Sequence, residues 1–228
     1  MAKYRYETHL HTSEVSLCGK ATAAEQVQYY AELGYAGIVV TDHFFNGNCA
    51  VPREGISWHE KVERFCLGYI NAVEEGKKQG ISVFFGWEYG YRHTDLLTYG
   101  LSPKWLLKNP QIMEMNAWDY CDYVRQSGGA IIQAHPFRNQ PYIEEIRLKP
   151  SRVDGVEVIN GQNSKEENDM ALKFAKHYDL VQSAGSDNHT GYAHKTLAGI
   201  ETREKLRSSE DLVEVLKTRK FKVFTRKI

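Results

Sequence analysis

The strongest constraint on this chain is a repeated order of a short apolar run, a side chain able to bind metal, and a helix-forming segment. Runs such as 36–40 (AGIVV) and 130–134 (AIIQA) have the length and composition of buried strands. The polar residues that follow such runs are His9, His11, Asp42, His43, Glu88, His135, Asp187 and His189. Parallel strands of a β/α barrel end at one mouth, where barrel enzymes keep their chemistry. The order therefore predicts a barrel with a cluster of divalent metals at that mouth.

The chain alternates between predicted strands and helices along its whole length. The predicted strands are 3–8, 36–40, 81–85, 95–99, 130–134, 155–159, 180–184 and 221–224. Thr22 with Glu25, and Ser57 with Glu60, have the spacing of capping boxes and predict two helix starts. About seven β/α units result, with no linker, low-complexity segment or internal repeat. We therefore predict a single α/β domain, a β/α barrel covering residues 1–228.

Composition restricts the partners. The 228 residues, 42% of them hydrophobic, suffice for one sizeable core. Lys+Arg and Asp+Glu are both 29, which disfavours non-specific nucleic-acid binding. The N-terminal stretch MAKYRYETHL lacks the charged and apolar regions of a signal peptide, and no stretch is long and apolar enough for a membrane span. We expect a cytoplasmic protein without a membrane partner; its oligomeric state is left open.

The four cysteines do not form a CxxC pair, which argues against a thiolate zinc site or a dense disulfide framework. Cys66 and Cys121 fall on apolar helical stripes and are predicted to be core residues. Cys18 and Cys49 fall in loops, and we expect them near the site.

Each candidate ligand has a structural alternative when it is considered alone. His9 and His11 point the same way from an extended segment because side chains alternate along a strand. Asp42 would equally well cap a helix, and a single histidine such as His135 is more often hydrogen-bonded structure than ligand. Glu88 needs a cation or several donors if it is buried. Five such signals at strand ends together favour a metal site.

Taken in order, the motifs HLHTS, TDH, GWEYG, AHPF and SAGSDNH resemble those of the polymerase and histidinol phosphatase (PHP) family of metal-dependent phosphoesterases. The resemblance implies a distorted (β/α)7 TIM-like barrel with two or three divalent metals at the strand carboxyl ends. It places His9, His11, Glu88 and Asp187 around one metal. It further implies that Glu88 bridges to a second metal held also by His135, and that His43 and His189 serve a third.

The chain departs from the family pattern in two places. Many members have a further histidine a few residues beyond HxH, but 12–18 reads TSEVSLC, so Glu14 or water is left to complete the third site. The family often has a histidine opening the strand after the glutamate motif, where this chain has Asp95. His93 competes with Asp95 for this position. A carboxylate there favours Mn²⁺ or Fe²⁺, with Zn²⁺ as the alternative.

A phosphate beside metals needs further donors for its outer oxygens. Arg138, three residues after His135, is the first candidate because its planar guanidinium forms paired bonds with phosphate. A surface salt bridge is the alternative, and Lys195 and Arg53 are weaker candidates. His189 or His194 would protonate the leaving group if it does not bind metal. His59 and His177 lie on predicted amphipathic helices, Asn160 or Asn163 would line the pocket, and none of these needs to bind metal.

The predicted function is hydrolysis of a small phosphomonoester by a metal-bound hydroxide at a two- or three-metal centre of Mn, Fe or Zn, with Glu88, Asp187, His189 and Arg138 as catalytic residues. Histidinol phosphate is one possible substrate. A nucleotide or oligonucleotide phosphoesterase is the second reading, and the balanced charge argues mildly against it. A non-catalytic barrel module is the third and is disfavoured because nearly all ligand types are retained.

Overall fold

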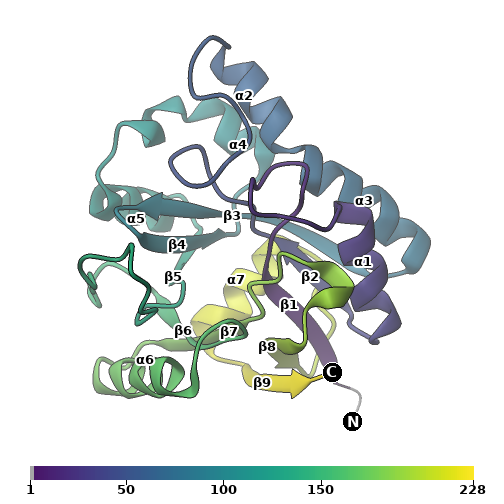
Figure 1. Ribbon diagram of the computed structural model, residues 1–228, viewed down its shortest axis with the longest axis vertical. Helices are drawn as coiled ribbons and strands as arrows, with labels where there is room; N and C mark the ends of the chain where they lie inside the picture. Colours follow the sequence, from purple (N-terminus) through teal and green to yellow (C-terminus); the bar gives the residue numbers. More distant parts are fainter. Residues whose placement is uncertain (1–2) are drawn as a thin grey trace.

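The computed structural model describes residues 3–228 as a curved mixed sheet with helices packed around its outside (Figure 1). The strands are β1 (Tyr4–Leu10), β2 (Gly37–Val40), β3 (Ser82–Tyr91), β4 (Thr94–Tyr99), β5 (Ala130–Gln133), β6 (Gly155–Asn160), β7 (Val181–Gly185), β8 (Thr196–Thr202) and β9 (Phe221–Lys227). The α-helices are α1 (Ala23–Glu32), α2 (Trp58–Phe65), α3 (Leu67–Gln79), α4 (Pro103–Lys108), α5 (Ala117–Gln126), α6 (Lys165–His177) and α7 (Ser209–Thr218). Two short 3-10 helices are η1 (Pro110–Met113) and η2 (Gly191–Ala193).

The strands form one sheet in the order β7-β6-β5-β4-β3-β2-β1-β8-β9, which curls into a nearly closed barrel (Figure 1). No ladder joins β7 to β1 within the described chain; instead, Thr8 Oγ1 donates to the carbonyl of Ala184 at 2.6 Å. A Cβ at Gly185 would lie 2.4 Å from the Cβ of His9, so glycine allows the two strands to approach there. The predicted distorted β/α barrel is confirmed.

The parallel order is interrupted by a hairpin that the sequence analysis missed. β3 continues past its predicted end at Phe85 to Tyr91, and β4 returns antiparallel to it. Only Arg92 and His93 separate the two strands, with φ values of 49° and 62°. A two-residue turn with both φ values positive matches the right-handed twist of the strands and requires antiparallel pairing. Glu88 therefore lies inside a strand and not at its end.

Other local predictions also need correction. β8, which pairs antiparallel with both β1 and β9, was not predicted. The helix expected from Ser57 is divided at Cys66 into α2 and α3, and the Ser57 side chain accepts from the Glu60 amide without the reciprocal half of a capping box. At Thr22 both halves are present, as predicted.

Apolar packing on the outside of the sheet fixes the strands that carry the site. Trp87 and Phe44 are fully buried, with their rings 5.8 Å apart, and Trp87 Nε1 donates to Tyr120 on α5 at 2.6 Å. Cys66 and Cys121 are buried, as predicted. In residues 3–228, no helix has both the length and the apolar character that crossing a membrane requires.

Candidate metal centre

Side chains from β1, β3 and the segments after β2, β5 and β7 meet inside the barrel at the carboxyl ends of the parallel strands. Their ligand atoms form three overlapping groups, each within 4.8 Å: His11 with His43 and His189, His9 with Glu88 and His135, and His9 with His11 and Asp187. His9, His11, Glu88 and Asp187 are at most 1% exposed. The predicted residues are therefore brought together, although they are far apart in the chain.

The local backbone explains how these side chains face inward. Leu10 is fully buried on the opposite side of the chain from His9 and His11, as strand alternation requires. His135 and Asp187 adopt φ values of 29° and 55°, which are rare for residues other than glycine. Left-handed backbone costs free energy and is often found at functional positions. Here it marks two candidate ligands.

Glu88 occupies the middle of the cluster. Its Oε1 lies 3.1 Å from His135 Nε2 and 3.4 Å from His9 Nε2. Its Oε2 lies 2.8 Å from His43 Nδ1 and 3.4 Å from His11 Nε2, yet no donor is directed at this buried oxygen with hydrogen-bond geometry. A buried carboxylate oxygen without a hydrogen bond needs a cation. The orphaned oxygen and the nitrogen and oxygen donors around it fit a divalent metal.

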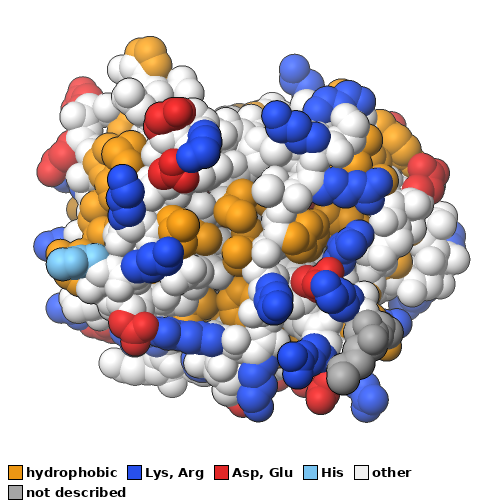
Figure 2. Space-filling model, turned by 90° about the horizontal axis from the view of Figure 1, so that it is seen from below, with side chains coloured by type: hydrophobic (Ala, Val, Ile, Leu, Met, Phe, Trp, Pro, Cys, Tyr) orange, Lys and Arg blue, Asp and Glu red, His pale blue; other side chains and the backbone are white. Residues whose placement is uncertain are grey.

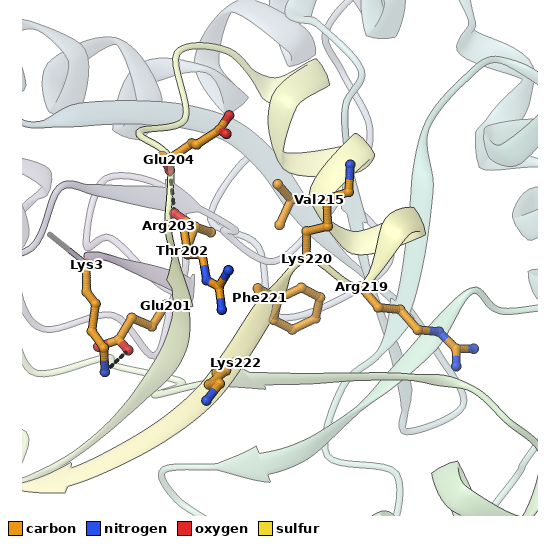
Figure 3. Close-up of a pocket in the computed structure, with 10 residues that line it drawn as sticks. All are labelled: Lys3, Glu201, Thr202, Arg203, Glu204, Val215, Arg219, Lys220, Phe221 and Lys222. Atoms are coloured by element: carbon orange, nitrogen blue, oxygen red, sulfur yellow. Dashed lines mark hydrogen bonds and ion pairs between the residues drawn. The ribbon is translucent and has the colours of Figure 1, made fainter. Parts of the chain in front are cut away.

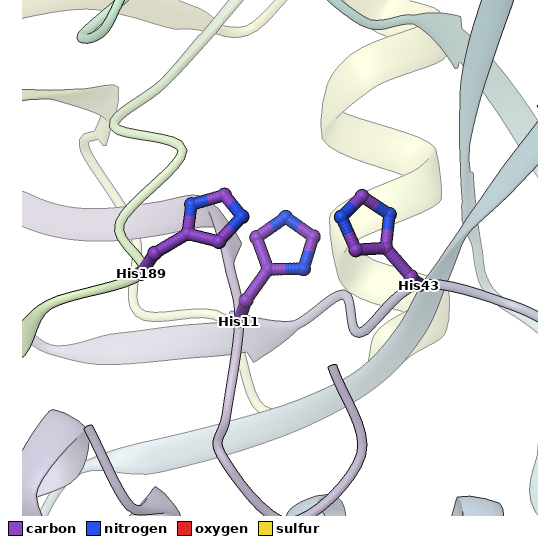
Figure 4. Close-up of side chains that lie close together, drawn as sticks. All are labelled: His11, His43 and His189. Atoms are coloured by element: carbon purple, nitrogen blue, oxygen red, sulfur yellow. The ribbon is translucent and has the colours of Figure 1, made fainter. Parts of the chain in front are cut away.

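Three imidazole rings lie side by side at the mouth, with His11 between His189 and His43 (Figure 4). The ring centroids of His11 and His189 are 4.1 Å apart, and those of His11 and His43 are 4.3 Å apart. Burial, together with the charges of His189 and His43, lowers the pKa of His11 well below its usual value. His11 therefore holds a neutral ring, the form that binds metal.

The carboxylates of the cluster remain ionised because cationic neighbours surround them. Burial disfavours the charged form of Glu88, but His43 and His9 outweigh it and hold the pKa well below its usual value. For Asp187, His9 and Arg138 outweigh burial in the same way and lower the pKa. Burial also opposes the charged form of His9, but Glu157, Asp187 and Glu88 raise its pKa well above the usual value.

Hydrogen bonds behind the cluster fix which ring nitrogens face it. Glu157 Oε1 lies 2.9 Å from His9 Nδ1, so Nδ1 carries the proton and Nε2 faces the cluster. Glu157 Oε2 also accepts from the His135 amide at 3.0 Å. Ser16 Oγ donates to Asp42 at 2.7 Å and lies 3.1 Å from His11 Nδ1, which orients that ring similarly.

Asp42 is not directed into the cluster, and it does not cap a helix either, since its partners Thr12 and Ser16 lie in the loop between β1 and α1. Its carboxylate accepts from the amide and hydroxyl of Thr12 at 2.6 and 2.7 Å and from Ser16. Burial raises the pKa of Asp42 to about 6, although these hydrogen bonds oppose the shift. Asp42 thus fixes the loop after β1 rather than contacting a metal.

Sequence reasoning gave no role to two fully buried carboxylates, Glu7 and Glu157. Glu7 Oε1 accepts from the amides of His9 and Ser186 at 2.8 and 2.9 Å, and its Oε2 accepts from the Ser186 hydroxyl. It therefore links β1 to the segment that carries Asp187. A single acidic residue in an otherwise apolar strand, as in GVEVIN around Glu157, is the signal that could have found them.

Asp95 and His93, the two alternatives for one ligand position, are separated by the hairpin turn. Asp95 lies on β4 with a carboxylate oxygen 3.8 Å from His135 Nε2. Burial and the neighbouring charge of Glu88 raise the pKa of Asp95. His93 lies in the turn, exposed, with its ring 5.5 Å from that of Tyr142. The geometry favours Asp95, because His93 precedes β4 and does not share a strand face with Asp95.

Several weaker candidates lie away from the cluster. Glu14 accepts from the amide of Ala23 at 3.0 Å, where a carboxylate is favoured by the start of α1. His194 Nε2 lies 2.9 Å from the carbonyl of Thr196, so this ring does not line the mouth. Lys195 and Arg53 are exposed and contact backbone carbonyls of Tyr192 and Gly47. His59 and His177 are exposed on helices, as expected.

Arg138 reaches the cluster. Its Nη2 lies 2.5 Å from Asp187 Oδ2 and 3.1 Å from Asn160 Oδ1, and its Nε donates to Asn163 at 3.2 Å. Burial opposes the charge, but Asp187 outweighs it and raises the pKa of the guanidinium. This pair is not a surface salt bridge, because the Asp187 side chain is only 2% exposed and that of Arg138 is 18% exposed.

Cys18 is the loop cysteine that the prediction placed near the site. Burial disfavours its thiolate, but hydrogen bonds with His189 and His43 outweigh burial and lower the pKa of Cys18 to about 6. The sulfur of Cys49, the other loop cysteine, accepts instead from the amide of Val51 at 3.4 Å.

The cluster opens into a cavity of about 610 Å³. Its lining includes Cys18, Asn46, Tyr91, Arg92, His93, Arg138, Tyr142 and Ile143 as well as the metal-ligand candidates. A second cavity, of about 680 Å³, lies near the amino-terminal end of β1, where Arg203, Arg219, Lys220 and Lys222 surround Phe221 (Figure 3). Its carboxylate Glu201 is paired with Lys3 at 2.8 Å. The face seen from below carries many lysine and arginine side chains among fewer acidic ones (Figure 2).

Comparison with known proteins agrees with this geometry. The model of the PHP domain matches residues 7–220. A two-domain protein from Bacteroides vulgatus, containing a predicted PHP-like metal-dependent phosphoesterase, superposes with a TM-score of 0.75 at 16% identity over 99% of this chain; the chain spans 65% of that protein. A presumed metal-dependent phosphoesterase from Bifidobacterium adolescentis gives 0.56 at 18% identity, covering 92% of this chain and 95% of the other.

A third similar structure is an amidohydrolase from Chromobacterium violaceum with bound sulfate and no metal. It gives a TM-score of 0.58 at 15% identity, covering 92% of this chain and 96% of its own. At these identities, the likeness concerns the fold. No curated protein matches the sequence.

Proposed function

Because this chain belongs to the PHP domain family, we propose that it is a metal-dependent phosphoesterase acting on a small phosphomonoester. One observation carries the proposal: three overlapping groups of ligand atoms, each within 4.8 Å, border a single cavity. Such a set suits two or three adjacent divalent cations.

The donors divide between metals because each ring nitrogen binds one cation. The Nε2 atoms of His9 and His11, with Asp187 and Glu88, would hold a first metal. Glu88 and His135, with Asp95 beside them, would hold a second, so that Glu88 bridges the two as the motif resemblance implied. His43 and His189 remain for a third.

Bound there, the cations would activate a water for attack on phosphorus and neutralise charge on the phosphate. Arg138 would contribute the remaining donors. Its Nη2 and Nε are held by Asp187, Asn160 and Asn163, whereas its Nη1 makes no hydrogen bond to residues 3–228. Arg138 is also one of the residues that line the cavity. A guanidinium fixed in this way would bind an outer phosphate oxygen without losing further side-chain freedom.

The cavity supports a small substrate. Its volume of about 610 Å³ is that of an ordinary small-molecule pocket. Tyr91, Arg92 and Tyr142 at its rim offer flat apolar faces and one cation, which suit the organic part of a phosphomonoester. The same rim would accept a mononucleotide, so nucleotides are the second candidate class.

A hydrolysis screen on protein of known metal content tests the proposal. Protein loaded separately with Mn²⁺, Fe²⁺ or Zn²⁺ is offered sugar phosphates, amino-alcohol phosphates including histidinol phosphate, nucleotides and short oligonucleotides. We expect more than one bound metal per chain and phosphate release that stops after chelation. A chain with metal content near zero after loading, or one that binds metals and hydrolyses none of these esters, contradicts the proposal.

A further inference from the structure

The second cavity, of about 680 Å³, lies at the end of the barrel opposite the metal centre. Tyr4, the first residue of β1, pairs with Thr202 on β8, which pairs in turn with Phe221 on β9. Thr202 and Phe221 line this cavity, whereas His9 and His11 lie toward the other end of β1. The two cavities have no lining residue in common. A ligand bound here would therefore leave the metal cavity open.

The lining of this cavity carries an excess of positive charge. Its cations are Lys3, Arg203, Arg219, Lys220 and Lys222, and its carboxylates are Glu201 and Glu204. Glu201 is already paired with Lys3 at 2.8 Å, and Arg219 is paired with Asp179 at 2.7 Å. Arg203, Lys220 and Lys222 form no ion pair with any residue from 3 to 228. Because the whole chain has no net charge, this excess is local and suits an anion with several negative charges.

An aromatic ring lies among these charges. Figure 3 shows Phe221 in the middle of the labelled side chains, with the Arg203 guanidinium extended toward it and the Glu204 carboxylate turned away. Phe221 is half-buried and packs against a core cluster, so its ring is held in place while part of it stays accessible. A ring of this kind stacks on a planar ring of a ligand while neighbouring cations bind phosphate groups.

The backbone near this cavity is unusual. Helices α1, α3 and α5 are each followed by a glycine with positive φ, namely Gly34 at 77°, Gly80 at 75° and Gly128 at 91°. Glycine is the usual residue at this position. Helices α6 and α7 are followed instead by Asp179 and Arg219, with φ values of 51° and 56°. Their side chains pair with each other, so a charged pair stands where glycine would avoid strain.

The other left-handed residues show where strain is found in this molecule. Apart from glycine, the remaining positive φ values within residues 3–228 all belong to residues that line the metal cavity: Arg92, His93, His135 and Asp187. Strained positions thus occur at the metal cavity and at the pair that Arg219 forms beside the second cavity. Such strain is characteristic of functional sites.

Protection of a sheet edge is the simpler explanation for part of the charge. β9 is the last strand of the sheet, and lysines on an edge strand prevent pairing with other chains. That explanation accounts for Lys222, which lies on β9. It does not account for Arg203, which follows β8, or for Lys220, which precedes β9. These two side chains line the same hollow although they come from different segments.

We propose that the basic cavity formed by Arg203, Lys220, Phe221 and Lys222 binds a small organic polyanion with a planar ring, of the nucleoside di- or triphosphate class. The phosphates would contact the three cations, and the base would stack on Phe221. The cavity volume is that of an ordinary small-molecule pocket. The donor groups of the metal centre contain no residue of the basic cavity, so its ligand is bound there and not hydrolysed.

Calorimetric titration with the imido analogue of ATP tests the proposal on the full-length protein. The variant Arg203→Glu/Lys220→Glu is compared with Arg207→Glu/Lys217→Glu, which makes the same charge change at exposed residues outside the cavity. An exposed ion pair contributes about 2–5-fold to affinity, and reversing a charge adds a repulsion of similar size. We therefore expect binding to weaken by at least about 10-fold in the first variant and to stay at the wild-type value in the second.

Two further measurements locate the ligand. Phe221→Leu keeps an apolar side chain but loses the ring, so its affinity for the analogue should fall by about 5–100-fold while its affinity for pyrophosphate stays unchanged. In the wild type, the analogue should protect Lys220 and Lys222, and not Lys217, from acetylation mapped by mass spectrometry. This measurement needs no variant, and circular dichroism checks that each variant is folded.

The results that overturn the inference are distinct from those that contradict the proposed phosphoesterase activity. Binding to the basic cavity should have the same affinity in metal-loaded and chelated protein, whether or not any ester is hydrolysed. Absence of saturable binding, equal affinity in the two charge variants, or unprotected Lys220 and Lys222 overturns it. Binding of a single-stranded oligonucleotide or of anionic vesicles that depends on Arg203 and Lys220, without binding of the analogue, also overturns it, because the partner would then be a macromolecule or a membrane.

Discussion

Replacing Glu7 by Gln should remove a pH-dependent loss of stability. Glu7 is fully buried on β1, and burial raises its pKa from 4.5 to about 7 despite hydrogen bonds from Ser186 and His9. Gln keeps an oxygen that can accept from the amides of His9 and Ser186. Its amide would donate to the Ser186 hydroxyl, which lies 3.1 Å from the carbonyl of Ala198 and can donate there instead.

The sign and size of the effect follow from the two pKa values. Between pH 4.5 and 7 the unfolded chain has released the Glu7 proton while the folded chain still holds it, so stability falls as pH rises through this window. The two pKa values, 4.5 and about 7, correspond to roughly 3.5 kcal/mol at about 1.4 kcal/mol for each pH unit between them. Glu7→Gln has no such proton to release, so its free energy of unfolding does not fall with pH for this reason.

Urea unfolding of the metal-free proteins between about pH 5 and pH 8 measures the effect. The free energy of unfolding of Glu7→Gln, relative to wild type, should increase by roughly 2–3 kcal/mol across this range. Glu201→Gln is the control, because the hydrogen bond with Lys3 lowers the pKa of Glu201 below 4.5; this carboxylate is ionised in both folded and unfolded chains over the whole range, so the difference between Glu201→Gln and wild type should not change with pH. A difference between Glu7→Gln and wild type that does not change with pH would refute the reasoning.

Further variants test the centre itself. Glu88→Gln and Asp187→Asn should each abolish hydrolysis and lower the amount of bound metal measured by element analysis. Their circular dichroism spectra should stay unchanged, because the strands beneath the site are intact. Wild-type turnover in either variant at saturating metal would show that the centre is wrongly assigned. Arg138→Ala should keep its metals, while kcat/KM falls about 10–1,000-fold, or roughly 1.4–4 kcal/mol of transition-state stabilisation. Arg138→Lys should recover part of this loss, and the exposed control Arg53→Ala should show no change. Normal kinetics in Arg138→Ala would show that Arg138 is not part of the site. Glu157→Ala should weaken metal binding about 10–100-fold in chelator competition, because the imidazole that it orients becomes free to turn; unchanged affinity would contradict that role.

The sequence predicted the barrel and its cluster because both depend on short-range patterns. An apolar run followed by a polar ligand identifies the end of a strand, and parallel strand ends meet by the geometry of the fold. His9, His11, Asp187 and His135 were located in this way. Arg138 was located by its spacing from His135 and does reach the cluster.

What the sequence did not reveal depends on tertiary contacts. The Arg92-His93 turn lacks the Gly or Asn that usually identifies a two-residue hairpin, so its positive φ values could not be anticipated. Glu7 and Glu157 appeared only as acidic residues in strands, because their partners lie more than a hundred residues away in the chain.

The candidate ligands lie on both sides of the gap in the barrel between β1 and β7. No strand ladder closes the sheet between β1 and β7 within the described residues, and polar contacts such as Thr8 to Ala184 and Glu7 to Ser186 join the two strands instead. His9 and His11 extend from β1, whereas Asp187 follows β7, so their donor group spans this join. A cation held there would cross-link the two sides and stabilise the folded form by mass action. The contacts between β1 and β7 place the ligands, and a metal bound by those ligands would in turn hold β1 and β7 together. Metal binding and closure of the barrel are therefore coupled.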